Sequence, residues 1–295
     1  MGKISLELAR QDYLLAKALQ GLSPRTLEDY DQFTGKLCRY LESNDLELTT
    51  GAIRQWLSTL NVGPVTLGIR IKVLRTFCRW LAAEGYLKTD VMAPIPNPKC
   101  PQVVPRVLAE GDTRKLIQAA RRKPRDFAIV LVLLDTGIRA SECCNLTLDD
   151  VDLDGMSLLI RNGKGQKDRN VYYSDLTARA LRRRLSCRPD DAVDDAVFLS
   201  QQTGRRLNRN SLAVAVKRLG TRAGIRGSAS PHDLRRTFAT RWILNGGDSH
   251  SLARIMGHKT TRMAEKYVFM AAGQVAEAHA RFSPVARLAR NGVRR

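Results

Sequence analysis

The feature of this sequence that most limits its fold is a cluster of prolines about one third of the way along the chain. Five of the eleven prolines lie between residues 94 and 105. Because proline fixes its φ angle and lacks an N–H, such a stretch forms neither a helix nor a paired strand and behaves as a stiff, extended linker. We therefore expect one domain at residues 1–92, a linker at 93–105 and a second domain at 106–295. A chain of 295 residues is long enough for each domain to have its own core.

The net charge of +20 is unusual for a globular protein and is unevenly distributed. Residues 1–100 contain 13 Lys and Arg against 10 Asp and Glu, a net of +3, whereas residues 101–295 contain 36 against 19, a net of +17. Such a balance predicts a polyanionic partner, and nucleic acid is the usual one. Composition alone leaves open a surface that is basic only for solubility. If DNA is the partner, most of the attraction comes from the second domain.

Cysteine spacing and hydropathy limit the compartment and the cofactors. The six cysteines form no CxxC pair and no Cys/His spacing typical of a zinc site, so we expect free thiols in a reducing cytosol. The first fifteen residues lack the apolar core of a signal peptide. The longest apolar run, Ala128–Leu134, is too short to span a bilayer. The sequence therefore predicts a cytoplasmic protein without a metal site and without a membrane partner.

Residues 1–90 have helical spacing. Ser23 can cap a helix with Pro24 at its first position, a second helix covers about 50–60, and a third follows the Gly63–Pro64 break and ends near Glu84. This predicts an all-helical first domain. The third helix carries a basic stripe, for which a solvated face and contact with phosphate are equal alternatives; its members are Arg70, Lys72, Arg75 and Arg79.

The second domain has mixed periodicity. Two segments, 156–161 and 170–174, read as strands of a hairpin whose tip is rich in Gly and Lys. The other periodic segments are helical, at about 109–122, 128–134, 175–186, 208–223, 231–245 and 249–256. We therefore expect a mainly α fold with a small antiparallel β-sheet.

Four segments carry residues suited to phosphate chemistry, and each has an ordinary explanation when taken alone. In DTGIRASE, Arg139 stands just before a new helix, as a surface arginine at a helix start would. In NGKGQKDR, two glycines flank Lys164 at the hairpin tip, where it can reach a DNA groove or an active site, or form only an exposed charged turn.

The third and fourth segments are SPHDLRR and MGHKTTRMAEKY. Ser230 can cap a helix on which His232 and Arg235 share one face near the positive end, a place suited to phosphate and equally typical of a capped helix with a surface ion pair. His258 follows a helix-ending glycine, and Tyr267 comes nine residues later. A lone tyrosine is more often a packing residue than a nucleophile.

Six residues of these segments, taken in order, resemble the active-site series of the tyrosine recombinase (phage integrase) family. They are Arg139, Lys164, His232, Arg235, His258 and Tyr267. The similarity includes the sequence around these residues, namely the motifs TGIRASE, GKGQKDR, HDLRRTFAT and MGH, the last followed by tyrosine nine residues after its histidine. It covers about residues 106–270 in detail, and more loosely a helical N-terminal DNA-clamp domain, as in the two-domain Xer-type enzymes. Asp135, Met256 and Ala264 depart from residues usual in the family, without removing a catalytic group.

The resemblance implies a site-specific recombinase that cuts and rejoins duplex DNA through a 3′-phosphotyrosyl link, without metal, cofactor or ATP. Tyr267 would be the nucleophile and His232 its helper, and Lys164 would protonate the leaving 5′ oxygen. The arginines and His258 would stabilise charge on the phosphate, as planar guanidinium groups are suited to do. The phenol has an ordinary pKa of about 10, so it needs a base or a positive field to attack.

The resemblance also implies an assembly of four protomers on two duplexes, acting through a Holliday junction. Residues 268–295 would form a helical tail passed to a neighbouring protomer. A type IB topoisomerase-like enzyme and a catalytically inactive DNA-binding regulator remain the alternatives. The four protomers would be copies of this chain, with an assembly that includes a second recombinase as the alternative.

Overall fold

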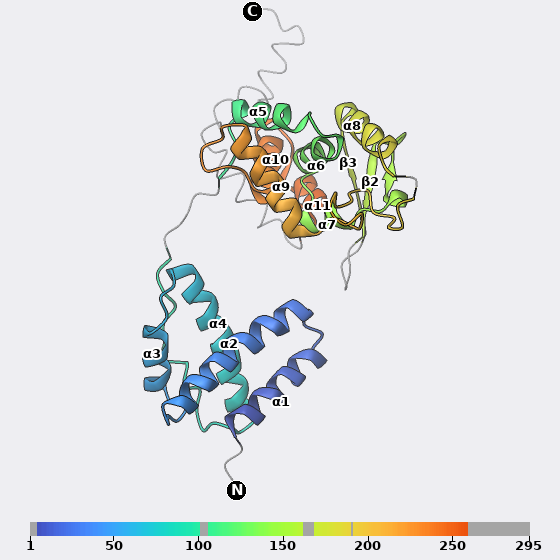
Figure 1. The fold of residues 1–295 in the computed structure, drawn as a ribbon. Helices are drawn as coiled ribbons and strands as arrows, with labels where there is room; N and C mark the ends of the chain where they lie inside the picture. The colour runs from blue at the N-terminus through green and yellow to red at the C-terminus, as the bar shows by residue number, and fades with distance from the viewer. Residues whose placement is uncertain (1–4, 101–105, 162–167, 190, 259–295) are drawn as a thin grey trace, which may run out of the picture. The chain divides into compact units, whose positions relative to one another are not determined.

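The computed structural model describes residues 5–100, 106–161, 168–189 and 191–258. The chain divides into two compact units, Met1–Val103 and Val104–Arg295, and each unit has its own hydrophobic core (Figure 1). Within the described ranges, no helix is long and apolar enough to cross a membrane.

The first unit consists of helices, as the sequence predicts. Polar side chains cap three of them: Ser5, Ser23 and Thr49 each accept a hydrogen bond from a backbone N–H three residues on. The core includes Tyr13 and Phe77, both fully buried, with ring centroids 5.0 Å apart. The four helices are α1 (Leu6–Leu19), α2 (Pro24–Ser43), α3 (Thr50–Ser58) and α4 (Pro64–Ala83).

The basic stripe on α4 is divided between two environments. Arg75 donates to the carbonyl oxygen of Ile95 at 2.7 Å and to Oδ1 of Asn97 at 2.8 Å, so it holds the beginning of the proline-rich segment against this unit. Arg70 lies over the ring of Phe33, 5.5 Å from its centroid. The other two members, Lys72 and Arg79, are exposed.

The second unit is built around one apolar helix, α6 (Pro124–Thr136). Residues 128–133 are buried on every side, because α5, α8, α9 and α10 pack around this helix. The helices predicted from the sequence are confirmed; the predicted ends match for 175–186 and 249–256 and differ by one to a few residues for the others. They are α5 (Glu110–Ala120), α7 (Ala140–Asn145), α8 (Asp175–Ser186), α9 (Arg209–Arg222), α10 (Pro231–Leu244) and α11 (Ser249–Met256).

The predicted hairpin is present and forms part of a three-stranded antiparallel sheet in the order β1-β2-β3. β2 (Ser157–Ile160) pairs with β3 (Arg169–Tyr172), and Ile160 stands opposite Arg169 where the hairpin opens towards its tip. The short strand β1 (Val151–Asp152), which follows the 3-10 turn η1 (Leu148–Asp150), was not expected, since two residues give no alternating pattern. The mainly α fold with a small antiparallel sheet is therefore confirmed.

A glycine at the end of α6 brings two helices together. Gly137 has φ +61°, and a Cβ atom built on it would lie 2.2 Å from Cδ1 of Phe238 on α10. No other residue fits this approach without displacing the ring. The turn after α6 therefore runs directly against α10.

Asp135, one of the departures from the usual family sequence, joins α6 to α8. Its Oδ2 accepts hydrogen bonds from the backbone N–H and Oγ of Ser174, both at 2.7 Å, and from Oγ1 of Thr177 at 2.6 Å. The carboxylate thus anchors the first turn of α8, so the aspartate has a structural role in this chain.

Candidate active site

Arg139 lies directly before α7, as the Thr-Gly break predicts. One carboxylate oxygen of Glu142 accepts from the Arg139 backbone N–H and the other from its Nη1, both at 2.7 Å. Nη2 donates to the carbonyl oxygen of Gly257 at 3.2 Å. The Arg139 side chain is 39% exposed and that of Glu142 only 9%. A buried carboxylate thus orients a guanidinium group that stays open to solvent.

Arg235 is held by backbone carbonyls. The predicted capping box begins α10: Oγ of Ser230 accepts from the N–H of Asp233 at 3.2 Å, and Oδ2 of Asp233 accepts in return from the N–H of Ser230 at 3.0 Å. Arg235, in the next turn, is buried. Its Nη1 donates to the carbonyl oxygen of Gly137 at 2.5 Å and its Nη2 to that of Met256 at 2.7 Å.

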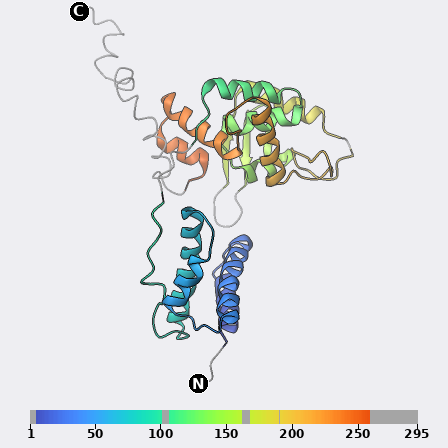
Figure 2. The ribbon, with the colours of Figure 1, turned by 60° about the vertical axis from the view of Figure 1, so that its left-hand side comes forward.

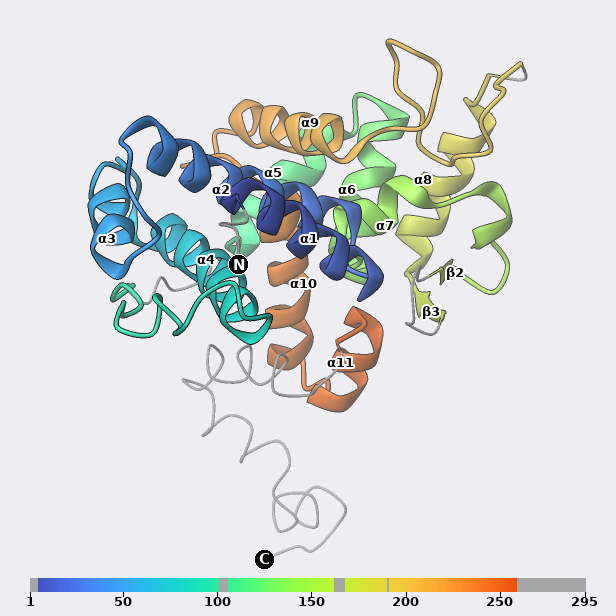
Figure 3. The same ribbon diagram turned by 90° about the horizontal axis from the view of Figure 1, so that it is seen from below.

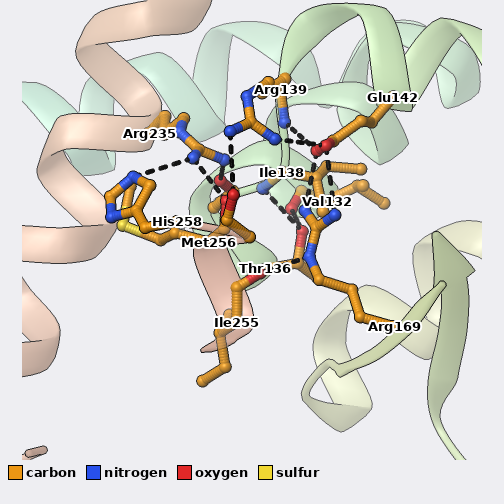
Figure 4. Close-up of polar contacts among 12 residues, drawn as sticks. Val132, Thr136, Ile138, Arg139, Glu142, Arg169, Arg235, Ile255, Met256 and His258 are labelled. Carbon is orange, nitrogen blue, oxygen red and sulfur yellow. Dashed lines mark hydrogen bonds and ion pairs between the residues drawn. The ribbon is translucent and has the colours of Figure 1, made fainter. Parts of the chain in front are cut away.

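Three consecutive carbonyl groups at the C-terminal end of α11 each accept a hydrogen bond from a different arginine (Figure 4). The last carbonyls of a helix have no partner inside the helix and carry its negative dipole end, so cations are favoured there. The arginines come from β3, α10 and the start of α7, and the end of α11 therefore joins three separate parts of the unit. The pairs are Arg169 with Ile255 at 2.8 Å, Arg235 with Met256 at 2.7 Å and Arg139 with Gly257 at 3.2 Å.

Gly257 makes this arrangement of α11 sterically possible. Its φ of +62° lets its N–H donate to the carbonyl oxygen of Arg254 at 3.1 Å, and the N–H of His258 donate to that of Ala253 at 2.9 Å, the pattern of a Schellman motif. A Cβ at this position would lie 3.0 Å from Cζ of Arg169. Glycine therefore both ends the helix and leaves room for Arg169. The same turn sets the position of His258, whose N–H is part of the motif.

Arg169 and Glu142 are functional candidates that the sequence did not single out. Nη2 of Arg169 lies 2.9 Å from Oε2 of Glu142 and Nη1 lies 3.2 Å from Oε1, and both side chains are almost buried. Although burial opposes ionisation, hydrogen bonds from Arg169 and Arg139 lower the pKa of Glu142 below its ordinary value. Only the spacing of a capping box, with Glu142 three residues after Arg139, could have indicated the carboxylate. Nothing local to Arg169 indicates its partner.

His258 lies beside Arg235, with its Nε2 3.3 Å from Nη2 of the arginine (Figure 4). Burial first, and then the positive charges of Arg235, Arg139 and Arg169, lower the pKa of His258 to about 4. The ring is therefore neutral at physiological pH. Because arginine only donates, Nε2 accepts and the ring proton belongs on Nδ1. That Nδ1 is buried and has no hydrogen-bond partner among the described residues, so a donor is available at this position.

Of the other three candidates from the sequence, the structure describes only His232. His232 is exposed near the start of α10, one turn before Arg235; partial desolvation, and then Arg236 and Arg235, lower its pKa below the ordinary value. Lys164 and Tyr267 lie outside the described residues, as does the expected tail at 268–295.

The cluster joins three guanidinium groups and one neutral imidazole around a single carboxylate. Its excess positive charge and its planar donors are suited to an anionic group with several oxygens, such as a phosphodiester. The electrostatic environment therefore favours an anion at the exposed side of Arg139.

Comparison with known proteins identifies the relatives of this chain. Residues 106–273 match the phage integrase family. The tyrosine recombinase XerA of Thermococcus onnurineus is 30% identical over 261 residues, which cover 87% of this chain and 89% of XerA. A crystal structure of XerA recombinase aligns with a TM-score of 0.57 at 27% identity, covering 94% of this chain and 98% of that chain.

The fold also resembles that of a lambda integrase dimer bound to a core site, with a TM-score of 0.73 at 19% identity, covering 90% of this chain and 77% of that chain. The sequence motifs, the matched family and the aligned structures agree over the unit that carries the arginine cluster. The chain therefore belongs to the phage integrase family and is a tyrosine recombinase.

Proposed function

We propose that this recombinase cuts and rejoins duplex DNA through a covalent 3′-phosphotyrosyl link at Tyr267. The observation that carries the proposal is the convergence of Arg139, Arg235 and His258 on the end of α11, with a donor on His258 and an open guanidinium on Arg139. These are the groups that phosphodiester cleavage needs when side chains alone offset the charge on the non-bridging oxygens.

The arginines differ in their access to a phosphate. Arg139 is 39% exposed along its side chain, whereas Arg169 is 11% exposed. We assign Arg139 to the scissile phosphate because it is exposed, and Arg235, although buried, because it lies beside His258. We assign Arg169, whose guanidinium group binds both oxygens of Glu142, to holding the cluster together. The neutral ring of His258, beside Arg235, donates a further hydrogen bond to a phosphate oxygen.

The bond changes follow from the chemistry of the side chains. Oη of Tyr267 attacks phosphorus, the bond from phosphorus to the 5′ oxygen breaks, and the tyrosine becomes esterified to the 3′ phosphate. His232 accepts the phenolic proton, and its lowered pKa keeps the ring neutral and able to do so. Lys164 gives a proton to the departing 5′ oxygen. Because the ester conserves the bond energy, the 5′-hydroxyl group of another strand can reverse the step without ATP.

We further propose that the substrate is duplex DNA, bound by a helical clamp at residues 1–92 and the catalytic domain at 106–295, in the cytoplasm. The +17 charge of residues 101–295 supports this partner. A lambda integrase with a similar fold has been solved as a tetramer bound to a Holliday junction. By analogy, four protomers of this chain would act on two duplexes.

A sulfur substitution tests the assignment of Lys164. On normal DNA, Lys164→Ala is expected to slow covalent adduct formation by about 10²- to 10⁴-fold, the usual contribution of a general acid. On DNA with a 5′-phosphorothiolate at the scissile bond the variant is expected to regain its rate, because a thiolate leaves without a proton. Arg139→Ala serves as the control and is expected to fail on both substrates, because it stabilises charge. If sulfur does not restore the rate of the lysine variant, Lys164 is not the acid.

A further inference from the structure

A second basic surface lies in the same unit, outside the arginine cluster. A hollow of about 900 Å³ lies between α5 and the end of α9. A smaller hollow of about 260 Å³ lies beside α8 and contains Phe127. Arg121 lines both, so the two hollows adjoin. We call this region the rear basic surface, and its cationic lining consists of Arg114, Lys115, Arg121, Arg122, Arg179, Arg183 and Arg222.

This surface has an unbalanced charge. Neither hollow has an aspartate or glutamate in its lining. Three of the cations pair with carboxylates at the edge, namely Arg114 with Glu110, Lys115 with Asp112 and Arg179 with Asp175. The remaining four, which are Arg121, Arg122, Arg183 and Arg222, are exposed and have no ion pair within the part of the chain that the structure describes.

Helix ends explain part of this pattern. Arg183 and Arg222 stand in the last turns of α8 and α9, and Arg121 follows α5, where a cation offsets the negative end of the helix dipole. That effect stabilises each helix separately and does not require the ends to meet. Here the ends of α5 and α9 and one face of α8 line two hollows that contain cations without acids, which is an arrangement suited to an external polyanion.

The position of the rear basic surface separates it from the arginine cluster. In Figure 1, α5 lies along the upper edge of the second unit, whereas α7 and α11, which carry Glu142 and the carbonyl acceptors of the cluster, lie along its lower edge. Figure 3, the view from below, shows α10 between α5 and α11. Figure 2 shows α5 (green) along the same edge from a second direction. α6, buried on every side, lies between the two edges. A straight duplex at the cluster would therefore not reach Arg122 or Arg222 of the same protomer.

We propose that the rear basic surface binds the phosphate backbone of a second DNA segment, independently of sequence. A guanidinium group can donate two parallel hydrogen bonds to the oxygens of one phosphate. Four such groups lie on a surface shared by three helices, those of Arg121, Arg122, Arg183 and Arg222. DNA is favoured over an acidic protein segment because DNA continuing from the bound site is present at high effective concentration. That last argument rests on the proposed function, whereas the charge and the geometry of the surface do not.

The test counts duplexes bound per protomer by sedimentation at low salt. The probe is a fluorescent duplex of about one and a half helical turns, mixed with the full-length protein. Wild type is expected to bind two duplexes per protomer at saturation, and Arg121→Gln/Arg122→Gln/Arg222→Gln is expected to bind one. The matched control, Arg182→Gln/Arg205→Gln/Arg226→Gln, removes the same charge from exposed arginines that line neither hollow, and it is expected to bind two.

Each other outcome overturns the proposal. A wild-type protein that saturates at one duplex has no second site, and a triple variant that still binds two places that site elsewhere. If a poly-glutamate peptide binds wild type but not the variant, while the duplex count stays at one, the surface is a protein-docking site. A photo-crosslinker at Gln118, which also lines the larger hollow, gives a second measurement that needs no arginine change. Tyr267→Phe is expected to bind two duplexes as well, so failure of the cleavage chemistry is distinguishable from failure of this inference.

Discussion

At the scale of single residues, the cluster depends on a carboxylate that no catalytic motif would predict. Glu142 orients Arg139 through two hydrogen bonds and holds Arg169 through two more. In a largely buried position such bonds are strong, and removing one partner leaves a charge without compensation. The position of Arg139, which we propose as a catalytic group, therefore depends through Glu142 on Arg169 of β3, a separate part of the sequence.

We expect Arg169→Ala to reduce the rate of covalent adduct formation by about 10²-fold, because a displaced catalytic group costs that much. Arg169→Lys restores the charge but not the fork that reaches both Glu142 and Ile255, so only partial recovery is expected. The matched control is Arg161→Ala. Arg161 directly follows β2 in the same hairpin, and its loss removes an ion pair with Asp150 in which Nε lies 2.6 Å from Oδ1. It should destabilise the fold while leaving the adduct rate near that of wild type. Equal losses of rate in both alanine variants would refute a positioning role.

The lowered pKa of His258 predicts a stability that depends on pH. The unfolded chain takes up a proton on this histidine near pH 6.5, whereas the folded chain does so only near pH 4. Between these values the unfolded state binds more protons, so stability is fully present above pH 6.5 and decreases as the pH falls towards 4. Urea midpoints measured at pH 7.5 and 4.5 should differ more for wild type than for His258→Gln. An identical difference in the two proteins would show that the ring is not held neutral.

At the scale of elements, the ends of α6 and α11 determine where the three arginines and His258 meet. Gly137 and Gly257 both have positive φ angles; a methyl group on Gly137 would clash with Phe238 of α10, and one on Gly257 would press on Arg169 of the cluster. The sequence indicated helix breaks at both glycines, because Thr-Gly and Met-Gly follow apolar helices. It did not indicate that the carbonyls before and at Gly257 would each accept from an arginine, because those contacts join residues 21 to 118 positions apart.

Gly257→Ala tests this role of the α11 end. The left-handed conformation costs a residue with a Cβ about 1–2 kcal/mol, and the new methyl group would press on Arg169. Gly204→Ala has the same backbone cost at φ +66° but has no atom within 4 Å of its Cβ. Both variants should lose stability in urea unfolding, Gly257→Ala at least as much as Gly204→Ala, and only Gly257→Ala should lose adduct formation. Normal cleavage by Gly257→Ala would mean that the end of α11 does not position the site.

At the scale of the whole molecule, the sequence predicted the secondary-structure elements well and predicted poorly the contacts between residues far apart in the chain. The helices of both units were predictable because apolar spacing, Ser23, Ser230 and the prolines act within a few residues. The fold class followed from the same signals. The Arg169–Glu142 pair, the capping of α8 by Asp135 and the gathering of cations on the rear basic surface come from tertiary packing, which periodicity does not encode.

Tertiary packing also determines where the positive charge of the second unit lies. The three arginines of the cluster are balanced in part by Glu142, which leaves the cluster with a net charge of +2, three cations less one anion. Most of the +17 net charge of residues 101–295 must lie elsewhere, and the rear basic surface holds part of it. Composition predicted a polyanionic partner but could not predict two separate faces.

The central claim is that Tyr267 forms the covalent bond to DNA, and trapping that bond is its most direct test. Wild type and Tyr267→Phe are incubated with a nicked duplex that loses the leaving strand, and the products are separated under denaturing conditions. The account predicts a denaturant-stable protein–DNA adduct for wild type, mapped by peptide mass to Tyr267, and none for the phenylalanine variant, which should still shift the duplex on a native gel. An adduct formed by Tyr267→Phe, or one mapped to another residue in wild type, would contradict it.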